Sequence, residues 1–488
     1  MRRIFPPSVL TLFAAVLFAG FLSGLGCQEG ANNAAFGQKP KSEGQTTKAA
    51  PTAERADQPS AESSTGEDWP GFLGPRRDST SIETGILTDW NESPPKILWQ
   101  FPLHEGYGIG SVADGRYYQL DAQRGAMTLY CLDPRTGKEF WKFSYDFQYR
   151  DLLGYDAGPR CSPVIHNGRV FIYGVTGELH CLDTATGEKL WRVDVNEKYG
   201  VMQNFFGVGS TPVVYGDLLL AMVGGSPEES SRLPPGALDR VKPNGSAVVA
   251  FDQKTGEEVY RVGDDLASYA SMAWAKVGNR DYGLAFCREG LLVFDPATGD
   301  EDCHVPWRAR IIESVNAANP VVVGDEVLIT ETYGPGSAWI SLDESDRFGE
   351  IVRQDDPDSR EKSLQCHWNT PIYVEGYVYG SSGRHESNAE LRCVDWKTGE
   401  VKWSEPGLTR SSLLLIDGHF ICLTEIGELL LFRPNPEEFD LVARWTPADP
   451  DTGRPLLRTP AWSAPIVSHG LMYVRGADRM LCVELIPE

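Results

Sequence analysis

The chain has 488 residues and a formal net charge of −23, with 41% hydrophobic and 23% charged residues. This composition is that of a globular protein and excludes a wholly disordered or fibrous chain. The acidic excess argues against nucleic acid as a partner, because binding phosphates needs a clustered basic surface. The length allows two to four ordinary domains or one large repeat array.

Residues 1–27 have the features of an export signal. Arg2 and Arg3 form a short positive region, and an uncharged apolar run of 18 residues over 9–26 ends directly before Cys27. This order is typical of a secretory signal peptide. It resembles a bacterial lipoprotein signal, in which the cysteine is lipidated, although Gly24 stands where that family usually has Leu. We predict lipidation at Cys27, with a plain cleaved signal or an uncleaved anchor as alternatives. All three place the folded body outside the cytoplasm.

Residues 28–67 contain one aromatic residue and almost no aliphatic side chain larger than Ala. Such a segment cannot bury enough apolar surface to offset the loss of chain entropy on folding. We expect a disordered linker here, followed by a folded domain over 68–488. The segment from Trp69 to Asp78 at the start of that domain is expected to pack across it.

One sequence pattern recurs in the folded region about every 50 residues, the length of a propeller blade rather than of a helical repeat. Its best copies are CLDPRTGKEFWKF, CLDTATGEKLWRV, AFDQKTGEEVYRV and CVDWKTGEVKWSE. The residues before the Asp alternate as in a strand, Asp-x-x-Thr-Gly predicts a tight turn, and a second strand carries an aromatic residue. The motif residues are Asp133, Gly137, Trp141, Asp183, Gly187, Trp191, Asp252, Gly256, Asp395, Gly399 and Trp403.

A second hairpin, as in SPVIHNGRVFIYG at 162–174, precedes each of these turns. Two hairpins make a four-stranded antiparallel sheet, so the array predicts an all-β fold, an eight-bladed β-propeller. The eighth unit ends with the chain after three strands, whereas KILWQFPL at 96–103 is a strand with Trp99 at the aromatic position. We predict that this N-terminal strand completes the last blade and removes its open edge.

The Asp-x-x-Thr-Gly turn followed by Trp resembles the tryptophan-docking motif of the pyrroloquinoline-quinone (PQQ) propeller repeats. The resemblance covers essentially all of residues 96–488. That superfamily includes quinoprotein alcohol dehydrogenases and the lipoprotein propeller of the outer-membrane β-barrel assembly machine. The resemblance implies that each Trp stacks between neighbouring blades. Because the motif is structural, it implies an architecture and not a chemistry.

The quinoprotein dehydrogenases in that superfamily use a disulfide between adjacent cysteines, a catalytic Asp, carboxylate and Asn ligands for Ca²⁺, and a Trp beneath the quinone. This sequence has no Cys-Cys pair, no Cys-x-x-Cys-His haem motif and no metal-ligand spacing of His. Cys131, Cys181, Cys393 and Cys482 occupy the small position before the turn, where we expect buried thiols. We therefore predict no catalytic residue, no metal and no cofactor. A PQQ-dependent oxidoreductase is the alternative.

The segments directly before each innermost strand are expected to meet on one rim of the central channel. Their side chains either form a pocket for an anionic or sugar-like ligand or bond the rim backbone. The candidate rim residues are Arg160, Asn316, Asn319, His367, Trp368, Asn369, Arg410 and Trp462. The stretch 224–246 is either a recognition loop or a tolerated surface insertion.

Taken together, the sequence predicts an exported, lipid-anchored propeller that acts as a non-catalytic binding or scaffolding module in the bacterial envelope. Its place would be the periplasm or the outer membrane. Its partners would be envelope proteins or a small ligand, and its lipid anchor would hold it to the membrane. We expect a monomer.

Overall fold

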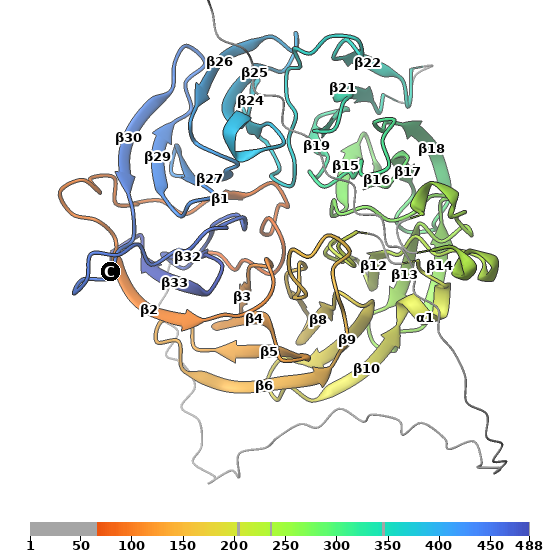
Figure 1. Cartoon of the computed structure of the whole chain (residues 1–488), viewed down its shortest axis with the longest axis horizontal. Coiled ribbons are helices and arrows are strands. Elements are labelled where there is room, and N and C mark those ends of the chain that lie inside the picture. Colours follow the sequence, from red (N-terminus) through yellow and green to blue (C-terminus); the bar gives the residue numbers. More distant parts are fainter. Residues whose placement is uncertain (1–65, 203–204, 235–236, 344–346, 488) are drawn as a thin grey trace, which may run out of the picture. The chain divides into compact units, whose positions relative to one another are not determined.

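The computed structural model describes residues 66–202, 205–234, 237–343 and 347–487, all within one compact unit of the chain. They form eight antiparallel sheets around a central axis (Figure 1), each with four strands, and one sheet has an additional short parallel strand. The predicted all-β, eight-bladed propeller is therefore confirmed. The expected signal peptide (1–27), its Cys27 and the linker up to residue 65 lie outside the described residues.

The first four blades follow one another along the chain. Blade 1 comprises β3 (Ser111–Ala113), β4 (Arg116–Gln123), β5 (Ala126–Leu132) and β6 (Glu139–Asp146). Blade 2 comprises β7 (Val164–His166), β8 (Arg169–Tyr173), β9 (Glu178–Asp183) and β10 (Lys189–Asp194). Blade 3 comprises β11 (Val213–Tyr215), β12 (Leu218–Met222), β13 (Val248–Asp252) and β14 (Glu258–Val262). Blade 4 comprises β15 (Ala273–Val277), β16 (Arg280–Phe286), β17 (Gly290–Phe294) and β18 (Glu301–Pro306).

The last four blades complete the circle. Blade 5 comprises β19 (Val321–Val323), β20 (Glu326–Glu331), β21 (Gly336–Ser341) and β22 (Ile351–Gln354). Blade 6 comprises β23 (Ile372–Val374), β24 (Tyr377–Ser382), β25 (Glu390–Asp395) and β26 (Val401–Pro406). Blade 7 comprises β27 (Ser412–Ile416), β28 (His419–Leu423), β29 (Leu429–Arg433) and β30 (Asp440–Trp445). Blade 8 comprises β31 (Ile466–Ser468), β32 (Leu471–Arg475), β33 (Arg479–Glu484) and β2 (Lys96–Pro102).

The Asp of each repeat holds the turn between the third and fourth strands. In blade 2, one carboxylate oxygen of Asp183 accepts the backbone N–H groups of Ala185 at 3.0 Å and Thr186 at 2.8 Å. The following Gly187 has φ 72°, in the left-handed region that favours glycine. The motif therefore encodes its turn locally, which is why it is readable from the sequence.

The aromatic residue of one blade packs on the turn of the next blade. Trp141 of blade 1 donates from its indole N–H to the backbone oxygen of Thr184 in blade 2, at 3.0 Å. A β-carbon on Gly187 would lie 2.5 Å from the Trp141 ring, and one on Gly256 would lie 2.7 Å from Trp191. The glycine is thus needed both for the turn and for the close approach of the indole.

Blades 4 and 5 use other side chains at the aromatic position. Cys303 takes it in blade 4, where a β-carbon on Gly349 would lie 2.9 Å from the sulfur atom. Arg353 takes it in blade 5 and donates to the backbone oxygen of Lys397 at 2.7 Å. Its guanidinium carbon lies 4.5 Å from the centre of the Trp339 ring, within the range of a cation–π contact. These substitutes explain why the repeat is weak in this part of the sequence.

The N-terminal strand closes the propeller as predicted. Strand β2 pairs antiparallel with β33, and Trp99 lies opposite Cys482. The Trp99 indole N–H donates to the backbone oxygen of Pro134 in blade 1 at 2.9 Å. The two ends of the folded chain therefore form one sheet, and β2 covers the outer edge of β33.

Residues 66–90, here called the N-terminal strap, run across one end of the channel. Trp69 forms an antiparallel bridge with Val112 of blade 1, and Pro70 accepts the Ile165 N–H of blade 2 at 2.8 Å. Strand β1 (Thr80–Ser81) pairs in parallel with β27 of blade 7. The expectation that this segment packs across the domain is confirmed.

The strap begins at the end of the channel where the inner strands finish. The Ser468 hydroxyl, at the end of β31, donates to the backbone oxygen of Glu67 at 2.7 Å. The Glu67 carboxylate pairs with Arg76 at 2.6 Å. Glu67, which the sequence analysis assigned to the linker, is therefore anchored to the strap and to blade 8.

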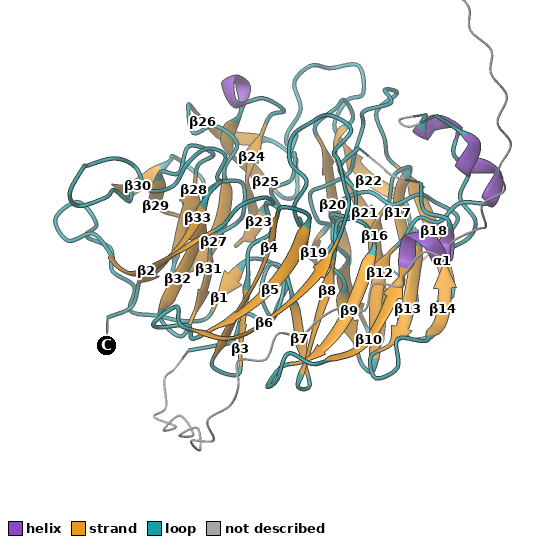
Figure 2. Ribbon diagram, turned by 60° about the horizontal axis from the view of Figure 1, so that its bottom comes forward, coloured by secondary structure: helices purple, strands orange, loops and turns teal. Residues whose placement is uncertain are grey.

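The helical turns lie in connections outside the sheets (Figure 2, purple). They are α1 (Val195–Tyr199), η1 (Glu228–Arg232), η2 (Leu238–Arg240) and η3 (Glu386–Asn388). Asp239 in the 224–246 insertion pairs with Arg288 at 3.0 Å and Arg308 at 2.8 Å, so this insertion is fastened to blade 4. Within the described ranges, no helix has the length and apolar character needed to cross a membrane.

The nine cysteines in the described part of the chain are free thiols. Cys131, Cys181, Cys393 and Cys482 are buried before their turns, as expected from the repeat. Burial raises the pKa of the Cys131 thiol to about 11, which keeps it protonated and inert at neutral pH.

Candidate functional site: a cavity at the channel mouth

A cavity of about 300 Å³ lies where the inner strands begin, at the end of the channel opposite the strap. Its walls come mainly from the connections between the last strand of one blade and the first strand of the next. Its floor includes Phe72 and Leu73 of the strap, which pass beneath it. The chain's own N-terminal segment therefore forms part of the floor of this cavity, here called the mouth cavity.

Four aromatic rings follow one another along one wall of the mouth cavity. The ring centres of His367 and Trp368 are 4.6 Å apart, and those of Trp368 and Trp462 are 4.7 Å apart. Tyr107 continues the row at 4.7 Å from Trp462. These rings come from blade junctions far apart in the sequence, and together they form an extended aromatic surface.

Further aromatic rings line the mouth cavity. The Phe206 ring lies 5.8 Å from Tyr155 and 5.5 Å from Tyr269, and Tyr155 approaches Trp462 at 6.3 Å. Tyr155 is 61% exposed and Leu153 beside it is 53% exposed, so apolar surface continues from the cavity to the rim. An apolar and aromatic cavity with few polar groups is the usual form of a small-molecule site.

Two of the three arginines in the cavity wall are already neutralised. Arg410 stacks on Trp368, with its guanidinium carbon 4.6 Å from the ring centre, and donates to Glu425 at 2.8 Å. Glu425 also accepts the Trp462 indole N–H at 2.8 Å, which fixes that ring. Arg160 pairs with Asp151 at 3.0 Å. These two cations position the aromatic wall rather than offer free charge.

Arg384 differs from the other two arginines. Its guanidinium carbon lies 4.4 Å from the centre of the Tyr333 ring. Within the described residues, no carboxylate forms an ion pair with it. Arg384 therefore supplies positive charge to the mouth cavity that a ligand can use.

His367 is held in its neutral form. Its Nε2 atom lies 3.1 Å from the Tyr333 hydroxyl, whereas its Nδ1 atom is buried and has no hydrogen-bond partner in the described part of the protein. Burial, reinforced by the nearby charges of Arg410 and Arg384, lowers the pKa of His367 to about 3. A neutral imidazole at this position can accept or donate one proton in a hydrogen bond to a ligand.

Glu331 lies behind Tyr333 at the end of β20. Burial raises the pKa of Glu331 to about 7, although the Ser314 hydroxyl and two backbone N–H groups donate to its carboxyl group. Those N–H groups belong to Tyr333 and Gly334, at 2.8 and 2.9 Å. The carboxyl group thus holds the 332–335 turn and changes its charge near neutral pH.

The structure brings six of the eight predicted rim residues together in the mouth cavity: Arg160, His367, Trp368, Asn369, Arg410 and Trp462. Asn316 and Asn319 lie elsewhere. Asn316 is fully buried and donates to the backbone oxygen of Cys287 at 2.7 Å. Asn319 accepts the backbone N–H of Ser271 at 2.8 Å and so ties blade 5 to blade 4. These two side chains bond the rim backbone, which was the other interpretation of the rim.

Several residues that line the mouth cavity were not predicted from the sequence. They are Phe72, Leu73, Tyr107, Tyr155, Phe206, Tyr333 and Arg384. Tyr269, which lies in a segment before an inner strand, lines the cavity as the repeat register predicts. Tyr333 and Arg384 follow the second strands of blades 5 and 6, whereas only the segments before the inner strands were considered. Phe72 and Leu73 reach the cavity through the strap. The only available signal was that aromatic residues gather in the connections.

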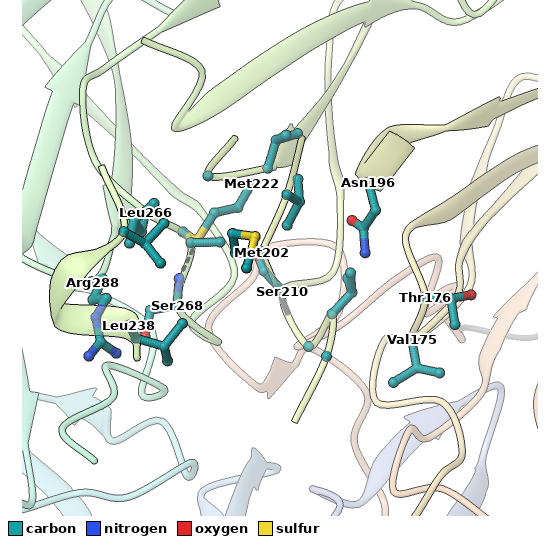
Figure 3. A pocket seen from close by; sticks show the side chains of 18 of the residues that line it. Val175, Thr176, Asn196, Met202, Ser210, Met222, Leu238, Leu266, Ser268 and Arg288 are labelled. Carbon is teal, nitrogen blue, oxygen red and sulfur yellow. Dashed lines mark hydrogen bonds between the residues drawn. The ribbon is translucent and has the colours of Figure 1, made fainter. Parts of the chain in front are cut away.

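A second cavity, of about 130 Å³, lies beside the 224–246 insertion at blades 2 to 4 (Figure 3). Thr176 and Asn196 lie on one side of it, and Leu238 and Arg288 on the other. Oxygen atoms of Thr176, Asn196 and Ser210 are buried here without a hydrogen-bond partner among the described residues. A space of this size and polarity accommodates a few water molecules.

The residues of the mouth cavity do not fit the Ca²⁺ and PQQ pair of the quinoprotein dehydrogenases. The cavity wall has one carboxylate, that of Glu313. The Asn369 side chain already donates to Ser381 at 2.8 Å and accepts from the His367 N–H at 3.2 Å. Among the described residues, no group of three or more His, Cys, Asp or Glu is placed to hold a metal ion. This donor set supports no reaction step through PQQ.

The fold and the docking motif define an eight-bladed propeller of PQQ-like repeats. Residues 125–405, more than half of the chain, match the family described as outer membrane protein assembly factor BamB. The chain belongs to this family. No curated protein matches its sequence.

Solved structures share the fold at low sequence identity. Quinohemoprotein alcohol dehydrogenase from Comamonas testosteroni has a TM-score of 0.61 and 14% identity, over 86% of this chain and 81% of that chain. A europium-containing methanol dehydrogenase has a TM-score of 0.59 and 13% identity, over 84% of this chain and 90% of that chain. BamB from Moraxella catarrhalis has a TM-score of 0.51 and 13% identity, over 80% of this chain and 99% of that chain. Likeness at these identities shows the fold alone.

Proposed function

We propose that this protein is a binding module of the bacterial envelope and that the mouth cavity is its ligand site. The observation that carries this proposal is the aromatic lining of a cavity whose floor includes residues of the protein's own strap. A pocket of this kind stabilises an apolar or flat ligand surface by excluding water from it. We favour binding over catalysis because the described part of the cavity wall has a single carboxylate, that of Glu313, and no set of metal ligands.

The chemistry of the wall favours a small ring-shaped anion, such as an acidic sugar. The Trp368 and Trp462 faces fit the apolar C–H face of a sugar ring. Arg384 then faces the negative group, and the neutral His367 and its partner Tyr333 supply hydrogen bonds. A ligand with both features uses the aromatic faces and the free cation together.

Titration calorimetry of the full chain with glucuronate and with glucose tests this proposal. We expect saturable binding of glucuronate and weaker binding of glucose. Arg384→Gln should abolish the preference for the acidic sugar, and Trp462→Leu should weaken both ligands. Arg433→Gln, at the end of β29 in blade 7, removes a charge that already pairs with Asp440 and should change the binding of neither sugar. Absence of binding, or an unchanged response in Arg384→Gln, contradicts the ligand class.

The alternative of a PQQ-dependent oxidoreductase makes a different prediction. A ligand that binds the native state alone raises the melting temperature. We expect PQQ with Ca²⁺ to leave the melting temperature of the full chain unchanged. A saturable rise, together with reduction of an artificial electron acceptor in the presence of an alcohol, would favour the oxidoreductase.

The envelope setting is supported by the predicted export signal and by the family description, which names an outer-membrane assembly factor. We propose that lipidated Cys27 holds the protein to a membrane of the envelope. Cys27→Ser should move the protein from the membrane fraction to the soluble fraction of fractionated cells. Unchanged retention on the membrane would indicate an uncleaved N-terminal anchor instead.

A further inference from the structure

A third cavity lies on the other side of the strap, at the end of the channel opposite the mouth. Its volume is about 340 Å³. Strap residues 70–77 form one wall, and the inner strands β7 and β11 with the starts of blades 4 and 5 form the other. Phe72 borders both this cavity and the mouth cavity, so the strap is the partition between them. We call this space the strap cavity.

Among the described residues, Arg77 is the one arginine or lysine in the lining of the strap cavity. Its guanidinium group donates to the backbone oxygen of Val214 at 2.8 Å and lies 5.1 Å from the centre of the Trp274 ring. No carboxylate in the described part of the protein forms an ion pair with it. Burial, with no opposing negative charge, lowers the pKa of Arg77 to about 10, so the group remains charged at neutral pH.

Two other arginines of this fold are more deeply buried than Arg77 and have more protein partners for their terminal nitrogens. Arg288, which is 1% exposed, pairs with Asp239 at 3.0 Å. Arg475 has no carboxylate partner either, but its two terminal nitrogens donate to backbone oxygens of the 106–108 segment. Among the described residues, Arg77 has one such acceptor for its five N–H donors. Because Arg77 is half-buried, its remaining donors stay accessible to water or to a ligand.

The backbone at Arg77 is also strained. Its φ is 59°, in the left-handed region that a long side chain rarely adopts. Strain of this kind persists where the surroundings hold it and is common at binding sites. The fold therefore keeps an unneutralised guanidinium group at the edge of a cavity at some cost in stability.

We propose that the strap cavity is a second ligand site, at which Arg77 binds an oxyanion, the carboxylate or phosphate group of a small molecule. The guanidinium fork matches two oxygens of such a group, and partial burial strengthens the pairing. The neighbouring polar side chains of the cavity, Thr211, Ser271 and Asn319, already bond the backbone between blades, so Arg77 supplies the recognition. This site is independent of the ligand proposed for the mouth cavity.

Melting temperature and titration calorimetry of the full chain, with inorganic phosphate and with citrate at constant ionic strength, test the proposal. We expect at least one of the two anions to bind saturably and to raise the melting temperature. Arg77→Met should weaken that binding at least tenfold. Arg76→Met is the matched control: it removes the same charge one residue earlier, where Glu67 already neutralises it, and should leave the affinity unchanged. If only one of the two anions binds, that result shows whether the site takes a phosphate or a carboxylate group.

The proposal is overturned if neither anion binds saturably, or if Arg77→Met and Arg76→Met respond alike. If Arg77→Met does not fold, Arg77→Lys replaces it, because it keeps the charge and removes the fork. An unchanged affinity in Arg77→Lys would also overturn the proposal. Arg384→Gln in the mouth cavity should not change the binding of phosphate or citrate. The two proposed sites can therefore fail independently, and the experiments show which of them has failed.

Discussion

Trp99 and Gly137 meet at the junction where the propeller closes. A β-carbon on Gly137 would lie 2.8 Å from the Trp99 ring. The indole N–H of Trp99 donates to Pro134 in the same turn, at 2.9 Å. Trp99 belongs to the N-terminal strand and Gly137 to blade 1, so this contact joins the last blade to the first by the same means that joins blades 1 and 2.

Gly137→Ala should therefore destabilise the protein through two effects. Gly137 has φ 68°, where any side chain costs about 1 kcal/mol, and the added methyl group must also displace the indole, at a further cost of about 1–3 kcal/mol. Gly115→Ala separates the two effects, because Gly115 has φ 67° with nothing within 4 Å of an added β-carbon. Chemical unfolding of both variants checks this. Equal losses of unfolding free energy in the two variants would mean that the Trp99 indole moves aside without a measurable cost.

Trp191→Ala should lose about 3–5 kcal/mol of the free energy of unfolding, the usual cost of emptying a large buried site. The Trp191 side chain is 9% exposed and donates to Gln253 in the next blade at 3.0 Å. Leu190→Ala is the control, because Leu190 on the same strand is 49% exposed. Urea unfolding measures both. A loss below about 1 kcal/mol for Trp191→Ala would contradict the docking role.

Two truncations test closure by the N-terminal strand. Deleting residues 1–65 should leave the melting temperature nearly unchanged, because residues 1–27 are the predicted export signal and residues 28–65 have almost no apolar side chain to bury. Deleting residues 1–104 removes the strap and β2, and it exposes the outer edge of β33. That protein should melt at a lower temperature or aggregate through the unpaired edge. Similar melting temperatures for the two proteins would refute the closure.

The architecture was readable from the sequence because its signals are local. The Asp183 turn and its glycine are fixed by residues within five positions of each other, and the spacing of such turns sets the number of blades. Trp99 was recognised by its match to the aromatic position of the repeat. The substitutes Cys303 and Arg353 were not recognised as docking residues, because their role depends on the neighbouring blade and not on the motif.

The mouth cavity was only partly predictable. The register of the sequence repeat predicts that His367, Trp368 and Trp462 lie at the channel mouth, and the structure confirms this. The same register does not show that the Asn316 side chain donates a hydrogen bond to the backbone oxygen of Cys287. Whether a side chain at a junction faces the channel or the neighbouring blade depends on unpaired backbone groups that the sequence does not reveal.

Glu331 gives a prediction on pH. Its pKa in the folded protein is about 7, above its ordinary value of 4.5, so the native state binds this proton more tightly than the unfolded chain does. The stability that protonated Glu331 contributes is therefore complete below about pH 4.5 and is lost as the pH rises through about 7. The shift corresponds to about 3 kcal/mol. Glu331→Gln keeps a neutral group of the same shape and should remove this loss.

The measurement is the free energy of unfolding of both proteins between pH 4.5 and 8, from urea denaturation at constant ionic strength. We expect wild-type stability to fall relative to Glu331→Gln by about 3 kcal/mol over this range, with the steepest change between the two pKa values. Ionised Glu331 still accepts the N–H groups of Tyr333 and Gly334, so the cost arises from burying its charge and not from losing those bonds. Parallel stability curves for the two proteins would show that Glu331 ionises as freely in the folded protein as in the unfolded chain.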